Sequence, residues 1–216
     1  LLAHISGDEN MISAFRSGFD IHSATACLLF DTTPENVTVE MRKKAKAINF
    51  GILYGMGEYS LSKDLHISVG AAKAYIEHYL ATYPKAGAYL EGVIKEAYRD
   101  GYVTTMFGRR RYIPELAAQN KNTKHFGERV AMNSPIQGSA ADIIKIAMVR
   151  VARDIAAAGL ASRMIMQVHD ELIFNVKPDE LDRLREIVVR DMADAYHGLV
   201  PLEVACGVAS NWLDAH

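Results

Sequence analysis

The chain has 216 residues, of which 50% are hydrophobic and 23% charged, and its formal net charge is −2. This apolar fraction is too high for a disordered chain. No uncharged apolar run reaches the roughly 18 residues that a membrane-spanning helix needs, so we expect no membrane partner. The composition predicts a folded globular protein, and the near-neutral charge by itself neither favours nor excludes an anionic partner.

The first residues of the chain and its two cysteines indicate where the protein is located and whether the chain is truncated. The two cysteines, Cys27 and Cys206, lie far apart in the sequence, and residues 1–5 lack the basic segment and cleavage site of a signal peptide. We therefore expect a reducing, cytoplasmic location. The sequence opens with Leu1 rather than Met, on an apolar stretch, which indicates a truncated chain.

The first half of the chain is predicted to be helical. From about residue 8 to about residue 99, apolar residues recur at helical spacing. Turn-forming residues interrupt this pattern at Gly18 and at residues 31–34, 55–57 and 83–84. These breaks predict a series of helices of ordinary length.

The second half has a mixed pattern. A long helix is predicted to end near Gly159, and residues 164–168 and 172–176 are predicted to form two strands of a hairpin. A further helix is expected from Pro178 to about residue 197, followed by a strand at residues 202–208. The predicted fold class is therefore α+β, with a helical part followed by an antiparallel sheet with flanking helices. The change of pattern places the boundary between residues 114 and 123.

Positive charge is concentrated in two segments. Residues 39–51 contain four basic side chains and one acidic side chain, and residues 108–130 contain six basic and two acidic side chains. Such local basic surfaces suit a protein that holds a polyanion in one cleft. A solvated helix face would give the same charge pattern.

The first basic segment has a specific order of side chains. Arg42, Lys46, Phe50 and Tyr54 are spaced four residues apart, so a helix would place two cations and then two aromatic rings in one row. At a rise of about 1.5 Å per residue, Arg42 and Phe50 are about 12 Å apart along the axis. A nucleoside triphosphate has a similar length, with phosphates for the cations and a base or sugar for the ring. The alternative is an ordinary row of core-facing residues.

Two acidic residues are predicted at the tip of the apolar hairpin. Asp170 and Glu171 follow His169 between the two predicted strands. Adjacent carboxylates repel each other, and a divalent cation such as Mg²⁺ relieves that repulsion. Because Asp is also common in turns for its backbone conformation, a purely structural turn is the competing interpretation.

A third set of polar side chains lies in the segment that follows the second basic region. Arg129 and Asn133 are one helical turn apart, and Pro135 is expected to break the helix before Gln137. Donors of this kind can reach the minor-groove acceptors that every correct base pair presents, and so can test pairing without reading sequence. An ordinary polar helix end is the competing interpretation.

Together these segments resemble the bacterial DNA polymerase I family, the A-type DNA polymerases. The resemblance covers the whole chain and lies in residues 20–22, 42–55, 101–105, 108–112, 133–142, 167–172 and 211–215. It implies a fingers subdomain at residues 20–118, and a palm formed by residues 1–19 and 119–216. The implied reaction is template-directed addition of deoxynucleotides to a primer 3′-hydroxyl.

The resemblance implies a role for each candidate residue. The incoming triphosphate would be bound by His22, Arg42, Lys46, Phe50 and Tyr54, and Phe50 suggests discrimination against nucleotides that lack a 3′-hydroxyl. Asp170 would bind the two catalytic Mg²⁺ ions, with Glu171 beside it. Primer–template DNA would be contacted by Arg109, Arg110, Arg111, Arg129, Asn133, Gln137 and His169.

One departure from the family pattern concerns the metal site. The family's other metal-binding aspartate precedes the stretch that begins at Leu1, as do the thumb and the first palm strand. Since two ions need ligands from separate strands, we expect the isolated chain to be inactive. The missing part of the polymerase is therefore an expected partner, beside DNA and deoxynucleotides.

Two other interpretations remain open, and two more fit the sequence less well. The missing strand could come from another polypeptide, or the chain could be a module that binds nucleotide or duplex DNA without chemistry, with salt-sensitive affinity that does not depend on Asp170. The single-subunit RNA polymerases have a similar helix, but Phe50, Gly51 and residues 169–171 fit the DNA enzymes better. A purely structural helical protein leaves the three segments unexplained.

Overall fold

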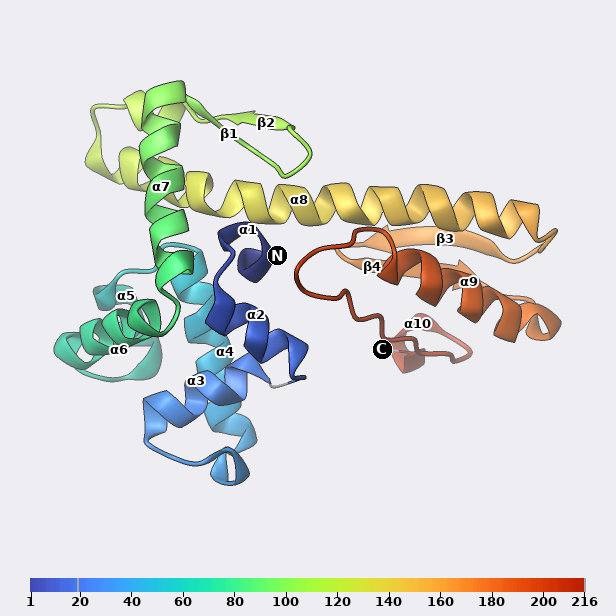
Figure 1. Ribbon diagram of the computed structural model, residues 1–216, viewed down its shortest axis with the longest axis horizontal. Coiled ribbons are helices and arrows are strands. Elements are labelled where there is room, and N and C mark those ends of the chain that lie inside the picture. Colours follow the sequence, from blue (N-terminus) through green and yellow to red (C-terminus); the bar gives the residue numbers. More distant parts are fainter. Residues whose placement is uncertain (19, 216) are drawn as a thin grey trace. The chain divides into compact units, whose positions relative to one another are not determined.

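The structure is a computed structural model that describes residues 1–18 and 20–215 (Figure 1). The chain forms two compact units, Leu1–Gln137 and Gly138–His216. Among the described residues, no helix is both long enough and apolar enough to span a membrane. The two units are described separately below.

The first unit consists mainly of helices, as predicted. They are α1 (Leu2–Ser6), α2 (Glu9–Arg16), α3 (Ile21–Phe30), the short 3-10 helix η1 (Pro34–Asn36), α4 (Val39–Leu53), α5 (Glu58–Leu65), α6 (Val69–Thr82) and α7 (Pro84–Asp100). Asp8, Asp20, Thr38 and Ser68 each cap a helix by accepting a hydrogen bond from a backbone N–H of its first turn. Pro84 occupies the first turn of α7, where its missing N–H costs nothing. The predicted breaks are therefore confirmed.

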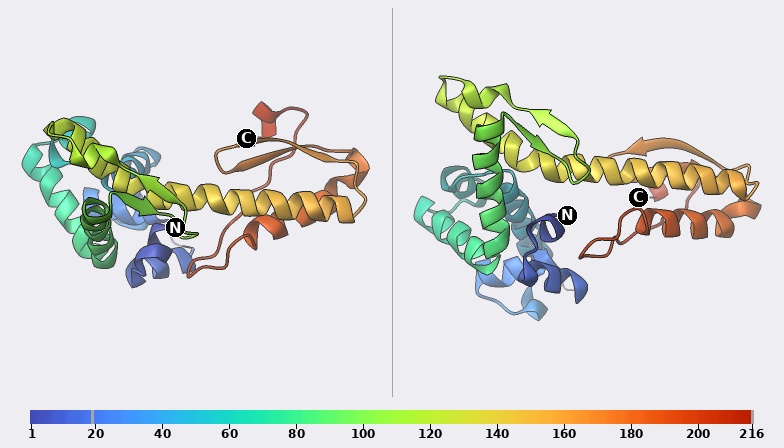
Figure 2. Two further views of the ribbon diagram at one scale, coloured as in Figure 1. Left: turned by 90° about the horizontal axis from the view of Figure 1, so that it is seen from above. Right: turned by 45° about the horizontal axis from the view of Figure 1, so that its top comes forward.

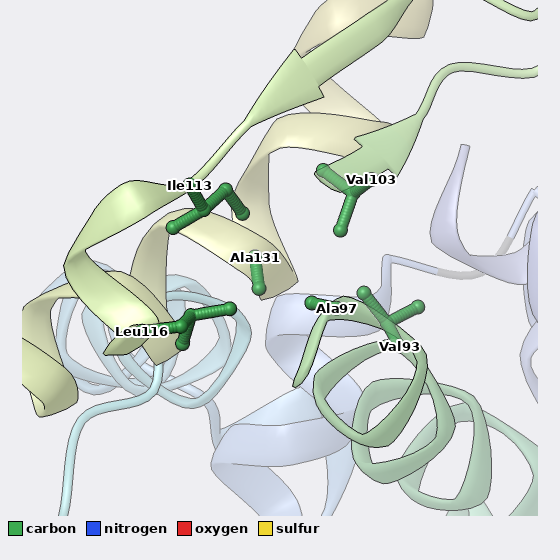
Figure 3. Close-up of a cluster of buried hydrophobic side chains, with 6 residues drawn as sticks. All are labelled: Val93, Ala97, Val103, Ile113, Leu116 and Ala131. Atoms are coloured by element: carbon green, nitrogen blue, oxygen red, sulfur yellow. The ribbon is translucent and has the colours of Figure 1, made fainter. Parts of the chain in front are cut away.

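A small hairpin, which the apolar pattern did not reveal, completes this unit. Strands β1 (Tyr102–Thr104) and β2 (Arg110–Tyr112) pair in antiparallel register, and the 3-10 helix η2 (Pro114–Ala117) follows. Buried apolar side chains join the hairpin, η2 and the start of α8 to α7, as Figure 3 shows: Val93, Ala97, Val103, Ile113, Leu116 and Ala131. This cluster anchors the exposed hairpin to α7 and to the start of α8.

Helix α8 (Lys121–Ala157) continues through Pro135, so the predicted helix break before Gln137 is wrong. A proline inside a helix removes one backbone hydrogen bond and crowds the preceding turn. Here the hydroxyl of Ser134 donates to the carbonyl of Val130 at 2.6 Å, which supplies a side-chain bond within that turn. The remaining backbone bonds of this 37-residue helix carry it past the proline.

The second unit contains the predicted hairpin. Strands β3 (Arg163–Val168) and β4 (Glu171–Asn175) are antiparallel, and Val168 pairs with Glu171. The register shifts between Met164 and Met166, so Ile165 is the extra residue of a β-bulge. His169 and Asp170 form the two-residue turn.

The core of the second unit lies between α8, the hairpin and α9. The 3-10 helix η3 (Pro178–Glu180) leads into α9 (Leu181–Ala193), and Figure 2 shows α9 and the hairpin alongside the C-terminal part of α8. Buried side chains of α8 and α9 form this core: Val151, Ile155, Leu184, Ile187 and Val188. Met164 and Phe174 of the hairpin pack against them. The core therefore fixes the base of the hairpin, whose turn stays exposed.

Two predictions about the C-terminal segment are wrong. Helix α9 ends at Ala193 rather than near residue 197, and residues 202–208 form no strand. No strand of the described residues is hydrogen-bonded to this segment, and an alternating sequence becomes a strand only when it has a partner. The chain continues without regular structure to a last short helix, α10 (Trp212–Ala215).

Candidate functional site

The predicted row of cations and rings lies on the exposed face of α4. Lys46 Nζ is 5.9 Å from the centroid of the Phe50 ring, and the rings of Phe50 and Tyr54 are 6.1 Å apart at 16°. Phe50 and Tyr54 are 40% and 39% exposed. The core is built instead by the other face of α4: Ala45, Ile48, Asn49 and Ile52. A core-facing row is therefore excluded, and the rings are available to a ligand.

Arg42, at the start of the row, is fixed by a carboxylate. Its Nε and Nη2 donate to the two carboxylate oxygens of Asp20 at 2.5 and 3.3 Å. Asp20 also accepts hydrogen bonds from the His22 N–H and the Ser23 hydroxyl. Burial by itself would raise the pKa of Asp20, but the bonds from Arg42, Ser23 and His22 lower that pKa to about 2. Asp20 thus remains charged and orients the guanidinium, whose Nη1 has no hydrogen-bond partner among the described residues.

His22 joins this group from α3. Its ring lies 6.0 Å from that of Phe50, and its Nδ1 is 2.9 Å from the amide nitrogen of Asn49. Burial lowers the pKa of His22, and Arg42 and Lys46 lower it further against the opposing effect of Asp20. The structure therefore brings three of the other predicted nucleotide-binding residues close to His22: Arg42, Lys46 and Phe50.

The fifth residue, Tyr54, is the C-cap of α4 and contacts α8. The amide of Gln137 donates to the Tyr54 hydroxyl at 3.3 Å. Gly55 follows with a φ of 71°, and a Cβ there would lie 2.1 Å from Cε of Met132. The positive φ favours glycine, whereas the methyl of Met132 is the end of a flexible side chain that can shift. The end of the ring row is thus held against α8.

Arg129, Asn133 and Gln137 lie on the same stretch of α8. Because α8 is continuous, their spacing of four residues places them in one row along the helix. Arg129 and Gln137 are exposed and Asn133 is half-buried, and Arg129 lies 5.9 Å from the ring centroid of Phe126. The structure therefore brings the three minor-groove candidates together, in a row that ends beside Tyr54.

The three consecutive arginines occupy the exposed hairpin. Arg110 and Arg111 are in β2, and Arg109 precedes them. Arg110 lies 4.8 Å from the ring centroid of Tyr102, which is 5.6 Å from the ring of Tyr112. This arrangement is an exposed cationic and aromatic surface, of the kind that binds nucleic-acid backbones.

The acidic hairpin turn has a strained backbone. His169 has a φ of 51°, a left-handed conformation that residues other than glycine rarely adopt, and Gln167 Nε2 donates to its carbonyl at 2.5 Å. Asp170 is exposed in the turn, and Glu171 is half-buried at the start of β4. Strain of this kind is often found where a side chain must be held in a functional position.

The acidic turn carries side chains of the type that binds a divalent cation, but too few of them to hold one. Carboxylate oxygens are the donors that Mg²⁺ prefers. Across residues 1–18 and 20–215, however, no group of three or more His, Cys, Asp or Glu side chains is arranged to hold a metal ion. The described residues therefore show no complete metal site at Asp170 and Glu171.

Sequence reasoning missed the residues that hold the predicted nucleotide-binding side chains in place. These are Asp20, which binds Arg42, and Asn49 and Thr25, which lie behind His22. Two signals could have indicated them: an aspartate just before a helix, and a polar residue on the apolar face of α4.

Comparison with known proteins identifies the class. The family model of DNA polymerase family A matches residues 1–214, and the chain belongs to this family.

Individual relatives agree with this assignment. The chain is 45% identical over 215 residues to DNA polymerase I of Geobacillus stearothermophilus, and 46% identical over 215 residues to the thermostable DNA polymerase I of Thermus thermophilus. Each match covers 100% of this chain but 24% and 26% of the relative, so the chain spans about a quarter of their length.

A solved structure is also similar. It is described as the POL domain of Pol1 from M. smegmatis in complex with DNA primer–template and dNTP. The TM-score is 0.95 and the identity 44%, with 99% of this chain and 38% of the other chain covered. The predicted α+β polymerase fold is therefore confirmed.

Proposed function

We propose that this chain is the fingers-and-palm part of a DNA-directed DNA polymerase that adds deoxynucleotides to a primer 3′-hydroxyl. The observation that carries the proposal is the exposed row on α4, in which Lys46 and Arg42 precede the rings of Phe50 and Tyr54, with His22 beside them. Family membership and a structural relative described with DNA and dNTP support it. The fingers would be residues 20–118 and the palm residues 1–19 and 119–216, with Phe19 itself outside the described residues.

The nucleotide-binding role follows from charge and shape. Lys46 and the free Nη1 of Arg42 would neutralise triphosphate oxygens, and Phe50 would pack on the sugar and base. Tyr54 would border the pocket for the template base. Cations on the leaving pyrophosphate favour phosphoryl transfer because negative charge accumulates there in the transition state.

The DNA-binding role belongs to residues of both compact units. In the first unit, Arg129, Asn133 and Gln137 would donate to minor-groove acceptors. The exposed side chains of residues 109–111 would contact phosphates. In the second unit, His169 would lie near the primer terminus.

Asp170 would be a ligand of Mg²⁺, with Glu171 beside it. When bound, a pair of Mg²⁺ ions would activate the primer hydroxyl and stabilise the leaving oxygen. The exposed position of Asp170 in the turn suits a ligand that must reach both metal and substrate. We also place the protein in the cytoplasm, a location supported by two free cysteines.

A second candidate function applies to the 216 residues on their own. Because the described residues hold no three-ligand metal group, this polypeptide would bind nucleotide and duplex DNA without catalysing extension. Salt-sensitive DNA binding that is equal in the wild type and in Asp170→Ala would support this function.

Nucleotide binding tests the proposal. We expect Lys46→Ala to weaken dNTP binding by about tenfold, the effect of losing one charged contact of about 1.4 kcal/mol. Lys44→Ala is the matched control, since Lys44 lies on the same helix but is 3.2 Å from Glu40. Equal losses in both variants would mean that α4 attracts nucleotide only through its overall charge, which would refute the proposed site.

A further inference from the structure

A buried amide lies directly behind the imidazole of His22. Asn49 is 4% exposed and lies on the inward face of α4, where α4 packs against α3. Its Nδ2 is 2.9 Å from Nδ1 of His22, and its Oδ1 is 3.0 Å from the hydroxyl of Thr25. A buried polar side chain in this position needs partners, and these two contacts provide them.

The contacts determine which imidazole nitrogen carries the proton. The hydroxyl of Thr25 lies 3.0 Å from Oδ1 of Asn49 and 2.9 Å from the carbonyl oxygen of Ile21, so its single proton is shared between two acceptors. The amide nitrogen Nδ2 of Asn49 faces His22. An amide nitrogen is only a donor, so Nδ1 of His22 must accept and carries no proton. The proton of the neutral ring is then on Nε2.

We propose that Asn49, oriented by Thr25, is a positioning residue that fixes His22 as the Nε2–H tautomer, so that the ring presents a hydrogen-bond donor to a nucleotide phosphate. The proposal rests on the proposed nucleotide-binding function of this face. It assigns roles to two buried residues that do not themselves touch the nucleotide.

The charges around His22 make the tautomer important. Asp20 faces the ring from the start of α3, and Arg42 and Lys46 face it from α4. Burial, Arg42 and Lys46 together lower the pKa of His22, so the ring is neutral near pH 7. A neutral ring protonated on Nδ1 would direct a lone pair at the phosphate and repel it. Fixing the proton on Nε2 lets a neutral histidine bind an anion.

Nitrogen NMR of ¹⁵N-labelled protein reads the tautomer directly. In the wild type we expect His22 to be protonated on Nε2 near pH 7. In Asn49→Asp the carboxylate can only accept, so the proton moves to Nδ1 and the pKa of His22 rises. Thr25→Ser keeps the hydroxyl and should keep the Nε2–H form, whereas Thr25→Val should give a mixture. Protonation on Nδ1 in the folded wild type would overturn the proposal, even if no variant folds.

Nucleotide affinity provides the second readout. In Asn49→Asp we expect dNTP binding to weaken by about tenfold as the pH rises through the increased pKa of His22, because the deprotonated ring loses its donor. The wild type should show no such loss over the same range. Equal pH profiles for the two proteins would overturn the phosphate role.

The two measurements separate this proposal from the proposed function. If the protein binds no nucleotide at all, the proposed function fails. The NMR spectrum of the free protein still decides whether Asn49 sets the tautomer.

Discussion

At the scale of single residues, Asp20 links a helix cap to the candidate site. It caps α3 and holds the guanidinium of Arg42 in one orientation. Asparagine also caps helices well, so Asp20→Asn removes the charge while keeping the cap. We expect this variant to bind dNTP several-fold more weakly, because Arg42 then loses its fixed direction.

The pH dependence of stability tests the same pair. The folded-state pKa of Asp20 is about 2 against an ordinary value of 3.8. The ion pair therefore stabilises the fold fully above about pH 3.8, and this contribution is lost as the pH falls toward about 2. Urea unfolding between pH 5 and roughly 2 should show a larger loss of stability for the wild type than for Asp20→Asn. Parallel curves would show that the pair contributes nothing, as is the case for many exposed ion pairs.

The turn residue His169 has a backbone conformation that lowers the stability of the fold. Its φ of 51° is unfavourable for an L-residue and costs nothing for glycine. We expect His169→Gly to raise the free energy of unfolding by about 0.5 to 1 kcal/mol in thermal or urea denaturation. We also expect the His169→Gly variant to bind primer–template DNA more weakly. A less stable variant would show that the histidine side chain stabilises the turn.

At the scale of elements, the junction of α4 and α8 positions Tyr54. A Cβ at residue 55 would lie 2.1 Å from Met132 Cε, and the φ of 71° is unfavourable for alanine. We expect Gly55→Ala to lower the free energy of unfolding by about 1 to 3 kcal/mol and to weaken dNTP binding. Gly101→Ala is the control, because Gly101 has a similar φ of 76° and nothing lies within 4 Å of its Cβ position. Similar losses in the two variants would contradict the close-packing explanation.

The elements also show how far sequence reasoning extends. The row on α4 and the β3–β4 hairpin were predictable because local periodicity determines them, at spacings of four and two residues. The pairing of Arg42 with Asp20, 22 residues away, was not predictable, because it depends on how α3 packs on α4. The continuity of α8 through Pro135 was likewise not predictable from the sequence. Residues 202–208 show the converse, since an alternating pattern does not itself supply a partner strand.

At the scale of the whole molecule, we expect DNA binding without catalysis. The first compact unit contains the predicted nucleotide-binding row and most of the predicted DNA-contacting residues, whereas the second unit contains the predicted metal ligand Asp170, and no group of three or more candidate ligands is found among the described residues. We therefore expect the 216-residue polypeptide to bind primer–template DNA with a steep salt dependence but to extend no primer in Mg²⁺. A primer-extension assay checks this. Template-dependent extension would show that the described residues suffice for catalysis.

The most direct test of the nucleotide site is photo-crosslinking. A dNTP with a photoreactive base is irradiated with the protein, and the labelled peptide is identified by mass spectrometry. We expect the label on the peptide that contains Phe50 and Tyr54, with labelling strongly reduced by Lys46→Ala and unchanged by Lys44→Ala. A label on the β1–β2 hairpin or in the second unit, with no effect of Lys46→Ala, would contradict a nucleotide site on α4.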